Sequence, residues 1–482
     1  MQDQSADVAI IGAGTAAMNA RRAVEKAGGT PLMIESGHYG TMCARVGCMP
    51  SKLLIAAADV AHEVATAAQF GIEVNAGWRI DGPKVLARVR AERDRFVGGV
   101  LRQIDALPDE QLLQGHARFV GPTMLQVDDH TRVTARAIVI ATGSTPFIPP
   151  PFDAIREHVL ISDAIFELTD LPRSLAVIGT GIIGLELGQA MQRLGVATTF
   201  FGRSDRLGHL TDPAIGEVLG ATLKDTLDLR LNTTITAATV VDAGIRLHYV
   251  DNDGGEYEET FEHVLVATGR RPNVANLDLA NSGLHLNARG LPDWNANTTQ
   301  CGEAPIFMAG DVSGYRPLLH EASDEGRIAG ANAMAYPDIV NHERRTPLAI
   351  AFTDPQMALV GQHYNELRDA LQRDRIEIGE VSFARQGRAS VMGRAAGLLR
   401  VYGDRDSCTL VGAELFGPRA EHLAHLLAWI VHERVPLPRV LEMPVYHPVL
   451  EEGLRTALRD LARKLKVTGS CREEDFACGP GD

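Results

Sequence analysis

Residues 7–35 read DVAIIGAGTAAMNARRAVEKAGGTPLMIE, and this stretch decides the fold. The apolar run Asp7–Ile11 stops at a Gly-Ala-Gly turn, and the residues that follow, Met18–Ala27, are typical of a helix. Apolar residues return at Leu32–Ile34. The order of strand, glycine turn, helix and strand predicts a βαβ unit, in which backbone N–H groups at the start of the helix can face an anion.

The same order recurs further along the chain, where residues 174–203 read SLAVIGTGIIGLELGQAMQRLGVATTFFGR. An apolar strand again meets a Gly-x-Gly turn, a helix follows, and apolar residues return at Thr198–Phe201. Two more apolar segments end in matching Ala-Thr-Gly tripeptides, at 141–143 and at 267–269. The repetition predicts two related units. The proline-rich segment Pro146–Pro151 separates them, because prolines interrupt both helices and central strands.

The sequence changes character beyond Thr346. The segments TPLAIAFTDPQMALVG, VSFARQ, LLRVYG and TLVGAEL predict strands, and Glu421–Arg434 predicts a helix. A further helix is expected over Leu450–Leu465, where leucines at 450, 454, 458, 461 and 465 line one face, as in a core or a subunit contact. These elements predict a third module of α+β type. The last residues, 468–482, lack periodicity and are expected to form a loose tail.

Composition limits the classes of protein that fit. The chain has 482 residues, 45% of them hydrophobic, which suffices for several buried cores. Its 47 basic and 61 acidic residues leave a formal net charge of −14, which argues against a basic nucleic-acid-binding protein. Six cysteines are too few for a disulfide-rich secreted scaffold, and no apolar run is long enough to span a membrane. We expect a cytoplasmic enzyme without nucleic-acid or membrane partners.

The first glycine turn has the features of a dinucleotide site. Gly12 and Gly14 leave room for backbone N–H groups to approach a pyrophosphate, and Ala17 occupies the third, small position. Glu35 follows Gly12 by 23 residues and ends the second strand, where a carboxylate bonds the hydroxyls of an unphosphorylated ribose. The first unit is therefore predicted to bind FAD or NAD.

The second glycine turn differs from the first in its sugar-binding position. Its three small positions are all glycine, namely Gly179, Gly181 and Gly184. The residue equivalent to Glu35 is Gly202, so the acid is missing, and Arg203 and Arg206 follow. A cation there binds a 2′-phosphate, which favours NADP(H); the alternative is that these arginines lie in a solvated loop. One permanently held flavin and one visiting nicotinamide suit the transfer of a hydride.

Two cysteines lie five residues apart in the motif GTMCARVGCMPSK, residues 40–52. Metal binding is one alternative, but the spacing does not match zinc motifs, and no second cysteine pair or histidine cluster is near in the sequence. Buried, inert thiols are another. The flanking glycines and the following Pro-Ser-Lys place the pair at the start of a helix, where the helix dipole favours thiolates and reactive sulfurs. A redox-active disulfide between Cys43 and Cys48 is the sharper hypothesis.

The cysteine motif resembles the active site of the class I pyridine nucleotide–disulfide oxidoreductases. The resemblance covers essentially the whole chain, and the further segments that carry it are GAGTAA with Glu35, both Ala-Thr-Gly tripeptides, IIGLELG, IFMAGD, FTDPQMALVG, and His447 and Pro448 with Glu452. It implies an α/β fold with two Rossmann-like dinucleotide-binding domains, for FAD and NAD(P), and a C-terminal α+β dimerisation domain. We accordingly expect an FAD-binding domain at 1–150, an NAD(P)-binding domain at 151–272, a return to the FAD-binding or central domain at 273–345, a dimerisation domain at 346–468 and a tail at 469–482.

The resemblance also implies roles for individual residues. Cys48 is expected to lie against the flavin and Cys43 to exchange with the substrate. Lys52 and Glu186 are expected to pair beside the flavin ring; a surface salt bridge is the alternative. The other cofactor-binding residues that it implies are Thr142, Gly143, Gly269 and Asp311. Of these, Asp311 would accept a bond from a ribitol hydroxyl, unless it is only a turn-forming aspartate.

His447 and Glu452 form a candidate acid–base pair. Thiol–disulfide exchange needs a group that takes a proton from an attacking thiol and returns one to a leaving thiolate. Glu452 follows His447 by five residues and can orient its imidazole. In the resembling family this pair comes from the partner subunit, so a homodimer is implied.

Single residues near the motifs limit the choice of substrate. Among the resembling enzymes the chain is closest to dihydrolipoyl dehydrogenases, as Ile182 and the Pro-Ser-Lys sequence indicate, although Tyr446 before His447 and Gly202 depart from their usual pattern. A glutathione-reductase-like or mercuric-reductase-like enzyme is the alternative, and Cys471 and Cys478 in the tail are a poor copy of the adjacent cysteines that end mercuric reductases. A flavin-binding redox sensor or assembly subunit is the alternative from another class.

We therefore expect an FAD-dependent oxidoreductase without a metal site. It is expected to pass electrons between NAD(P) and a small-molecule or protein-bound dithiol or disulfide.

Overall fold

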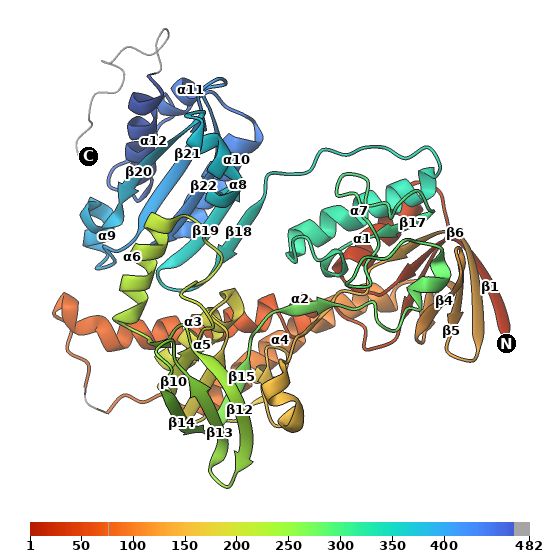
Figure 1. Cartoon of the computed structure of the whole chain (residues 1–482), viewed down its shortest axis with the longest axis horizontal. Helices are drawn as coiled ribbons and strands as arrows, with labels where there is room; N and C mark the ends of the chain where they lie inside the picture. The colour runs from red at the N-terminus through yellow and green to blue at the C-terminus, as the bar shows by residue number, and fades with distance from the viewer. Residues whose placement is uncertain (76, 467–482) are drawn as a thin grey trace.

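The computed structural model describes residues 1–75 and 77–466, and Figure 1 shows them in three lobes. The N-terminal lobe holds a seven-stranded sheet, the middle lobe a five-stranded sheet with a smaller one beside it, and the C-terminal lobe another five-stranded sheet. Helices α3 (Cys48–Thr66) and α5 (Ile182–Arg193) lie where the middle and C-terminal lobes meet. Among the helices of the described residues, none combines the length and the hydropathy that a bilayer-spanning segment needs.

The N-terminal sheet is built around the first βαβ unit. Strand β1 (Gln2–Ile11) pairs in parallel with β2 (Pro31–Glu35) and with β6 (Thr131–Ile140), and helix α1 (Thr15–Lys26) connects β1 to β2. Strand β17 (Ile306–Met308) also pairs in parallel with β6, so the chain returns to this sheet after passing through the middle lobe. The remaining strands of the sheet are β3 (Leu112–Gln114), β4 (Ala117–Gly121) and β5 (Met124–Val127).

Helices cover this sheet and lead into the middle lobe. Helix α7 (Leu319–Ala335) packs directly on α1, because Gly326 and Gly330 carry no side chain at the contact. A Cβ on either glycine would overlap a backbone carbonyl of α1. The other helices of this part of the chain are α2 (Met42–Arg45), α3 and α4 (Gly82–Asp105).

The middle lobe repeats the arrangement. Strand β9 (Ser174–Ile178) pairs in parallel with β10 (Ala197–Phe201) and with β15 (His263–Val266), and α5 connects β9 to β10. The other strands here are β8 (Leu160–Ile161), β11 (Asp228–Arg230), β12 (Thr234–Val241), β13 (Gly244–Val250) and β14 (Glu256–Phe261). Strands β7 (Ser144–Pro146) and β16 (Arg270–Pro272) pair with each other in a separate two-stranded sheet. Helix α6 (Pro213–Lys224) runs from this lobe towards the C-terminal sheet.

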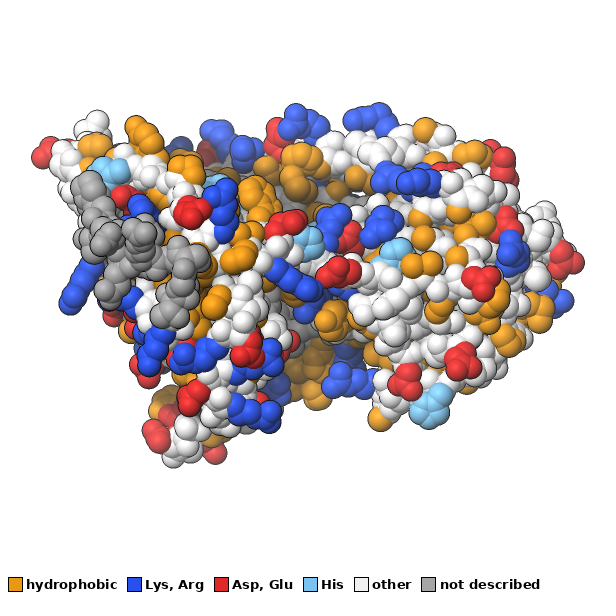
Figure 2. Space-filling model, turned by 90° about the horizontal axis from the view of Figure 1, so that it is seen from above, with side chains coloured by type: hydrophobic (Ala, Val, Ile, Leu, Met, Phe, Trp, Pro, Cys, Tyr) orange, Lys and Arg blue, Asp and Glu red, His pale blue; other side chains and the backbone are white. Residues whose placement is uncertain are grey.

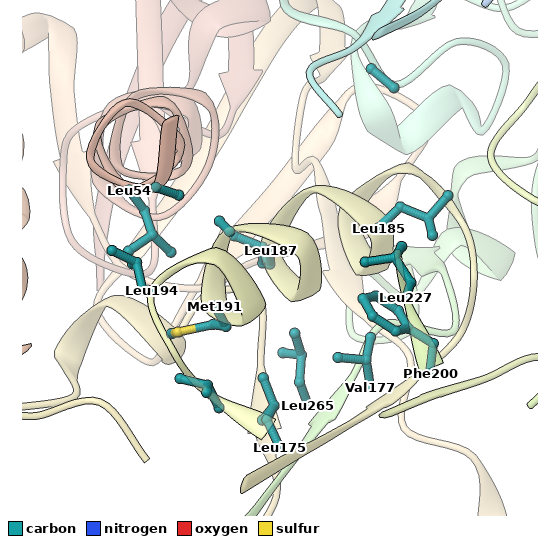
Figure 3. Close-up of a cluster of buried hydrophobic side chains, with 14 of the residues drawn as sticks. Leu54, Leu175, Val177, Leu185, Leu187, Met191, Leu194, Phe200, Leu227 and Leu265 are labelled. Atoms are coloured by element: carbon teal, nitrogen blue, oxygen red, sulfur yellow. The ribbon is translucent and has the colours of Figure 1, made fainter. Parts of the chain in front are cut away.

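A buried apolar cluster fixes α5 on its sheet. Figure 3 shows side chains of α5 packed against those of β9, β10 and β15, with Leu54 of α3 reaching in from the side. The labelled members are Leu54, Leu175, Val177, Leu185, Leu187, Met191, Leu194, Phe200, Leu227 and Leu265. Because burying such a side chain stabilises the fold by roughly 1.5–3 kcal/mol, the cluster sets the rotation of α5 and therefore the direction of its polar residues.

The C-terminal lobe is an antiparallel sheet covered by helices. Its strands, in spatial order, are β18 (Leu348–Ala351), β19 (Gln356–Gly361), β22 (Thr409–Gly417), β21 (Leu398–Asp404) and β20 (Ile376–Ser382). Its helices are α8 (Tyr364–Gln372), α9 (Gly387–Val391), α10 (Ala420–His432), α11 (Leu437–Leu441) and α12 (Glu451–Leu465). The five leucines predicted to line one face of the last helix are all buried in the core of this lobe, so their stripe is core rather than subunit contact.

The structure confirms the predicted α/β class, with two Rossmann-like units and an α+β module. One local prediction is wrong, because VSFARQ is not a single strand. Strand β20 ends at Ser382, whose side chain accepts a hydrogen bond from the Ala384 N–H, and this cap starts the 3-10 turn Phe383–Arg385. Residues Cys471 and Cys478 lie outside the described residues.

Candidate active site

A cavity of about 1300 Å³ is lined by residues of all three lobes. The first glycine turn opens into it at Gly14 and the second at Gly179 and Gly181, and both Cys43 and Cys48 line it. Its volume exceeds the 300–1,000 Å³ of an ordinary small-molecule site, so there is room for two ligands. Figure 2 shows that acidic and basic side chains intermingle over one face of the molecule rather than gathering into a basic patch.

The two cysteines come together at a junction of helices. Cys43 lies in α2, and Cys48 is the first residue of α3, with Gly47 as the N-cap. A Cβ on Gly47 would stand 3.1 Å from the Met42 carbonyl oxygen and 3.2 Å from the Cys43 Cα, so a larger residue would push the turns apart. The cysteines are free thiols in hydrogen-bond contact, which is the reduced form of the predicted couple.

This contact shifts the pKa values of the two thiols in opposite directions. The hydrogen bond from Cys43 lowers the pKa of Cys48 to about 7, with help from the Lys52 charge and against the effect of burial. The same hydrogen bond, together with burial, raises the pKa of Cys43. The expectation that helix entry favours thiolates at both sulfurs is therefore wrong for Cys43. When the pair loses one proton, the negative charge therefore lies on Cys48.

Lys52 and Glu186 form an ion pair beside the thiols, in which Glu186 is buried and Lys52 is partly exposed. The Lys52 Nζ lies 2.7 Å from Glu186 Oε2, and the Glu186 side chain is only 5% exposed. The other carboxylate oxygen accepts a hydrogen bond of 2.7 Å from the Phe352 N–H, and the Lys52 ammonium lies 4.6 Å from the centre of the Phe352 ring. The alternative of a surface salt bridge is therefore wrong, and both charged groups line the cavity.

The first glycine turn and its surroundings fit a flavin dinucleotide. Gly12 has φ +116°, and a Cβ there would overlap the Ala141 carbonyl, whereas the space where a Cβ of Gly14 would stand is open. Glu35 is anchored at the strand end, because its carboxylate accepts hydrogen bonds from the N–H groups of Ala13 (2.9 Å) and Gly37 (2.8 Å). The third small position, Ala17, is buried under the turn.

Asp311 and Gly143 line the same cavity. Asp311 Oδ2 accepts a hydrogen bond of 2.9 Å from the Ser144 hydroxyl, which fixes the carboxylate while its other oxygen stays free for a ligand hydroxyl. Thr142 does not line the cavity; its hydroxyl donates to the Asn273 carbonyl at 2.7 Å and braces the turn.

The second glycine turn has matching geometry. Gly179 has φ +111° and stands against the Ala267 carbonyl, as Gly12 stands against Ala141, and Gly184 lets α5 pack on the turn. Gly269 and Arg203 line the cavity beside it. Arg206 does not line it, although both arginines are exposed, and its carbonyl accepts a hydrogen bond of 2.8 Å from the Thr180 hydroxyl. The structure therefore separates the two predicted arginines.

The candidate acid–base pair is formed but lies away from the thiols. The His447 Nδ1 is 2.8 Å from Glu452 Oε1, and the other oxygen of Glu452 accepts the Val449 N–H at 3.1 Å. Burial opposes the charge, but these two hydrogen bonds lower the pKa of Glu452. His447 is 56% exposed and is not among the residues that line the cavity.

Sequence reasoning missed several residues at the site. The Arg270 guanidinium donates to the Ser144 hydroxyl and carbonyl, both at 2.8 Å, and lies 2.9 Å from the Met42 sulfur, next to Cys43. Its position directly after the second Ala-Thr-Gly tripeptide was an available signal. Phe352 was missed as well, and no local pattern marks it. Among the described residues, no three His, Cys, Asp or Glu side chains are grouped to hold a metal ion.

A dithiol with one acidic sulfur, a buried Lys–Glu pair, and two dinucleotide turns that share one cavity define a flavin-dependent disulfide oxidoreductase. The chain belongs to the family described as "Pyridine nucleotide-disulphide oxidoreductase", which it matches over residues 6–326. Residues 348–458 match the "Pyridine nucleotide-disulphide oxidoreductase, dimerisation domain". The cofactors are FAD and a pyridine nucleotide, and the predicted class of function is confirmed.

Curated relatives cover nearly the whole chain. A dihydrolipoyl dehydrogenase of Thermus scotoductus is 31% identical over 467 residues, covering 95% of this chain and 98% of its own. Dihydrolipoyl dehydrogenase 3 of Pseudomonas aeruginosa is 30% identical over 475 residues, with the same coverage of 95% and 98%. The dihydrolipoyl dehydrogenase of Chlamydia trachomatis is 29% identical over 461 residues, covering 93% and 95%.

Solved structures share the fold at lower identity. The HOCl-induced flavoprotein disulfide reductase RclA from Escherichia coli, in a Cu(II) complex, is 21% identical and has a TM-score of 0.79, with 95% of this chain and 99% of that chain covered. LpdA from Mycobacterium tuberculosis is 22% identical with a TM-score of 0.79 and the same coverage of 95% and 99%.

Proposed function

We propose that the protein is an enzyme of the dihydrolipoyl dehydrogenase type, which passes electrons between a dithiol or disulfide substrate and NAD(P) through Cys43 and Cys48. The observation that carries the proposal is the contact between these two thiols at the cavity, which lowers the pKa of Cys48 to about 7. The dihydrolipoyl dehydrogenases that match it along nearly their whole length support the substrate class.

The difference between the two sulfurs assigns their roles. In the oxidised pair, a substrate thiolate attacks Cys43, the S–S bond breaks, and Cys48 leaves as a thiolate, because the sulfur of lower pKa is the better leaving group. The second thiol of the substrate then displaces Cys43, which releases the substrate disulfide and leaves the reduced pair. Lys52 stabilises the negative charge on Cys48.

Thiol–disulfide exchange at Cys43 needs a base. His447, the candidate base, does not line the cavity of its own chain. Each substrate thiol must lose a proton before it attacks, and the pKa of Cys43 is raised, so Cys43 leaves with a proton. His447 suits this task, since Glu452 holds its Nδ1 and the Nε2 is left to take and return protons. We propose that His447 of the partner subunit acts at this cavity, in a homodimer made by the dimerisation domain.

The cofactor sites follow the two glycine turns. The residues proposed to hold FAD are Gly12, Gly14, Ala17, Glu35, Gly143 and Asp311, while Thr142 braces the turn beside them. When bound there, FAD supplies the two-electron acceptor that links nicotinamide to dithiol. For the nicotinamide nucleotide we propose Gly179, Gly181, Gly184 and Gly269, with Arg203 rather than Arg206 at a 2′-phosphate, because only Arg203 lines the cavity. This favours NADP(H).

The lack of an acid at Gly202 also supports a second candidate, a glutathione-reductase-like enzyme that uses NADPH. One assay separates the two: purified protein with lipoamide, glutathione disulfide or a mercuric salt, each with NADH and with NADPH. We expect lipoamide to be the preferred substrate of the three. Preference for glutathione disulfide by tenfold or more in kcat/KM would overturn the proposed type.

A further inference from the structure

A line of hydrogen-bonded and charged groups joins the C-terminal lobe to the helices that carry Lys52 and Glu186. Helix α5 contributes a residue on each successive turn, and helix α3 contributes acidic residues. In the C-terminal lobe, the segment that follows β18 binds to the residues of α5. We call this group the polar seam; its members are Asp59, Glu63, Glu186, Gln189, Arg193, Phe352, Asp354 and Arg394.

Gln189 lies at the centre of the polar seam and forms two hydrogen bonds with the backbone of Asp354. Its Nε2 donates to the Asp354 carbonyl at 3.0 Å, and its Oε1 accepts the Asp354 N–H at 2.7 Å. The Gln189 side chain is buried, at 5% exposure, so water does not compete for these bonds. A side chain that satisfies both polar groups of one residue fixes the position and the direction of that part of the chain.

Charges hold the outer end of the seam. Asp354 Oδ2 lies 2.8 Å from the Arg193 Nη2 and 3.1 Å from the Arg394 Nη1. Arg193 also pairs with Asp59 of α3 at 2.8 Å, and Arg394 pairs with Glu63 of α3. The Arg193 side chain is 9% exposed, and a buried charge that loses its partner is costly, so these ion pairs favour a single arrangement.

The inner end of the seam reaches the redox site. Phe352 precedes Asp354 by two residues; its N–H donates to Glu186, and its ring lies against the Lys52 ammonium. Lys52 lowers and Glu186 raises the pKa of Cys48, so the balance between these two charges acts directly on the thiolate. The placement of Phe352 decides how strongly Glu186 is neutralised and how closely Lys52 is held.

We propose that Gln189 is a positioning residue for the redox dithiol: through Asp354 it holds Phe352 on the Lys52–Glu186 pair, and so makes thiol reactivity depend on the docking of the C-terminal lobe. The inference rests on the proposed dithiol chemistry. It goes beyond that chemistry in assigning a role to a residue that contacts neither sulfur. The dimerisation domain thereby acts on the site through its own backbone, as well as through the proposed acid–base pair.

The test compares two glutamines of the same helix. Gln189→Met keeps the length of the side chain and removes both hydrogen bonds. Gln192→Met is the matched control, because Gln192 lies three residues along α5 and donates only to the Thr226 carbonyl (3.1 Å), at the protein surface. Each holoenzyme is reduced with dithiothreitol, freed of it, and alkylated with iodoacetamide across pH 5–9, and peptide masses locate the modified cysteine.

We expect the pH midpoint of alkylation of the Cys43–Cys48 pair to rise in Gln189→Met by about 0.5–1 unit, which is a three- to tenfold slower reaction at low pH. The reason is that Glu186 loses a hydrogen bond that shares its charge. Hydrogen exchange at the Phe352 amide is expected to speed up in the same variant. Gln192→Met is expected to change neither quantity.

An unchanged midpoint in folded Gln189→Met overturns the inference, as does an equal shift in Gln192→Met. If Gln189→Met does not yield folded protein, Gln189→Glu replaces it. The new carboxylate still accepts the Asp354 N–H but repels the Asp354 carbonyl oxygen. We expect the pH midpoint of alkylation to rise in this variant too, by less than in Gln189→Met. Because thiol ionisation is measured rather than turnover, a failure here leaves the proposed function standing, whereas loss of the proposed function appears only in the substrate assay.

Discussion

Replacing Lys52 by methionine removes one partner of a half-buried ion pair while keeping the apolar stem of the side chain. Glu186, at 5% exposure, then retains only the Phe352 N–H as a strong donor. Breaking a fully buried pair costs about 3–5 kcal/mol, and an exposed pair contributes about 0–1 kcal/mol. The Lys52 side chain is 35% exposed, so we expect an intermediate loss of about 2 kcal/mol in the free energy of unfolding.

The same substitution acts on the thiol. Lys52 lowers the pKa of Cys48, so its removal raises that pKa from about 7. With a pKa of about 7, Cys48 is partly thiolate at pH 7, and a rise of one unit reduces the thiolate fraction there about fivefold. The reduced variant is therefore expected to be alkylated about fivefold more slowly at pH 7 and to recover the native rate at high pH.

Urea unfolding and the pH dependence of alkylation measure the two effects. Lys84→Met is the matched control, because the Lys84 Nζ lies 2.8 Å from Asp81 but its side chain is 84% exposed. We expect that control to change neither the free energy of unfolding nor the thiol midpoint measurably. The reasoning is refuted if Lys52→Met matches the control in both measurements, or if its thiol midpoint falls.

Further predictions concern the other parts of the site. His447→Gln is expected to keep bound flavin and its reduction by nicotinamide, but to slow dithiol exchange by about 10²–10⁴-fold, measured by stopped-flow with each substrate alone; equal rates would remove His447 from the mechanism. Gly12→Ala is expected to yield protein with little or no flavin, because the backbone there has φ +116° and a Cβ meets a carbonyl, whereas Gly179→Ala keeps its yellow colour and raises the KM for the nicotinamide nucleotide. If Gly179→Ala lost its flavin and Gly12→Ala kept it, the assignments of the flavin and nicotinamide sites would have to be exchanged. Arg203→Ala is expected to weaken NADPH binding about tenfold and to leave NADH binding unchanged, as fluorescence titration can measure. Arg206→Ala, the control, is expected to change the binding of neither nucleotide. Cys301 is buried, and burial raises the pKa of its thiol to about 12, so iodoacetamide is expected to leave it unmodified at pH 8 in the folded protein, as peptide mapping can check.

Features that depend on local sequence were predictable. The glycine turns follow from a strand that must reverse tightly into a helix, so Gly12 and Gly179 were found from spacing alone, and both adopt the positive φ that their roles require. The leucine stripe of the last helix was visible from its period. The cysteine motif placed Cys48 at a helix start, as the structure has it.

Features that depend on contacts between distant segments were not predictable. Phe352 binds Glu186 across 166 residues of sequence, and Gln189 binds Asp354 across 165. The unequal acidity of the thiols depends on their mutual hydrogen bond, which the helix dipole argument did not include. His447 is placed away from the cavity of its own chain, and only the resemblance to a dimeric family pointed to a second copy.

The most direct test is a count of thiols on reduction. The oxidised holoenzyme is mixed without oxygen with one equivalent of NADPH, and with NADH in parallel, and the new thiols are trapped with a labelled maleimide. The account predicts two new thiols per chain, at Cys43 and Cys48 and at no other cysteine. Oxidation of the nicotinamide with loss of flavin colour and no new thiol would contradict it.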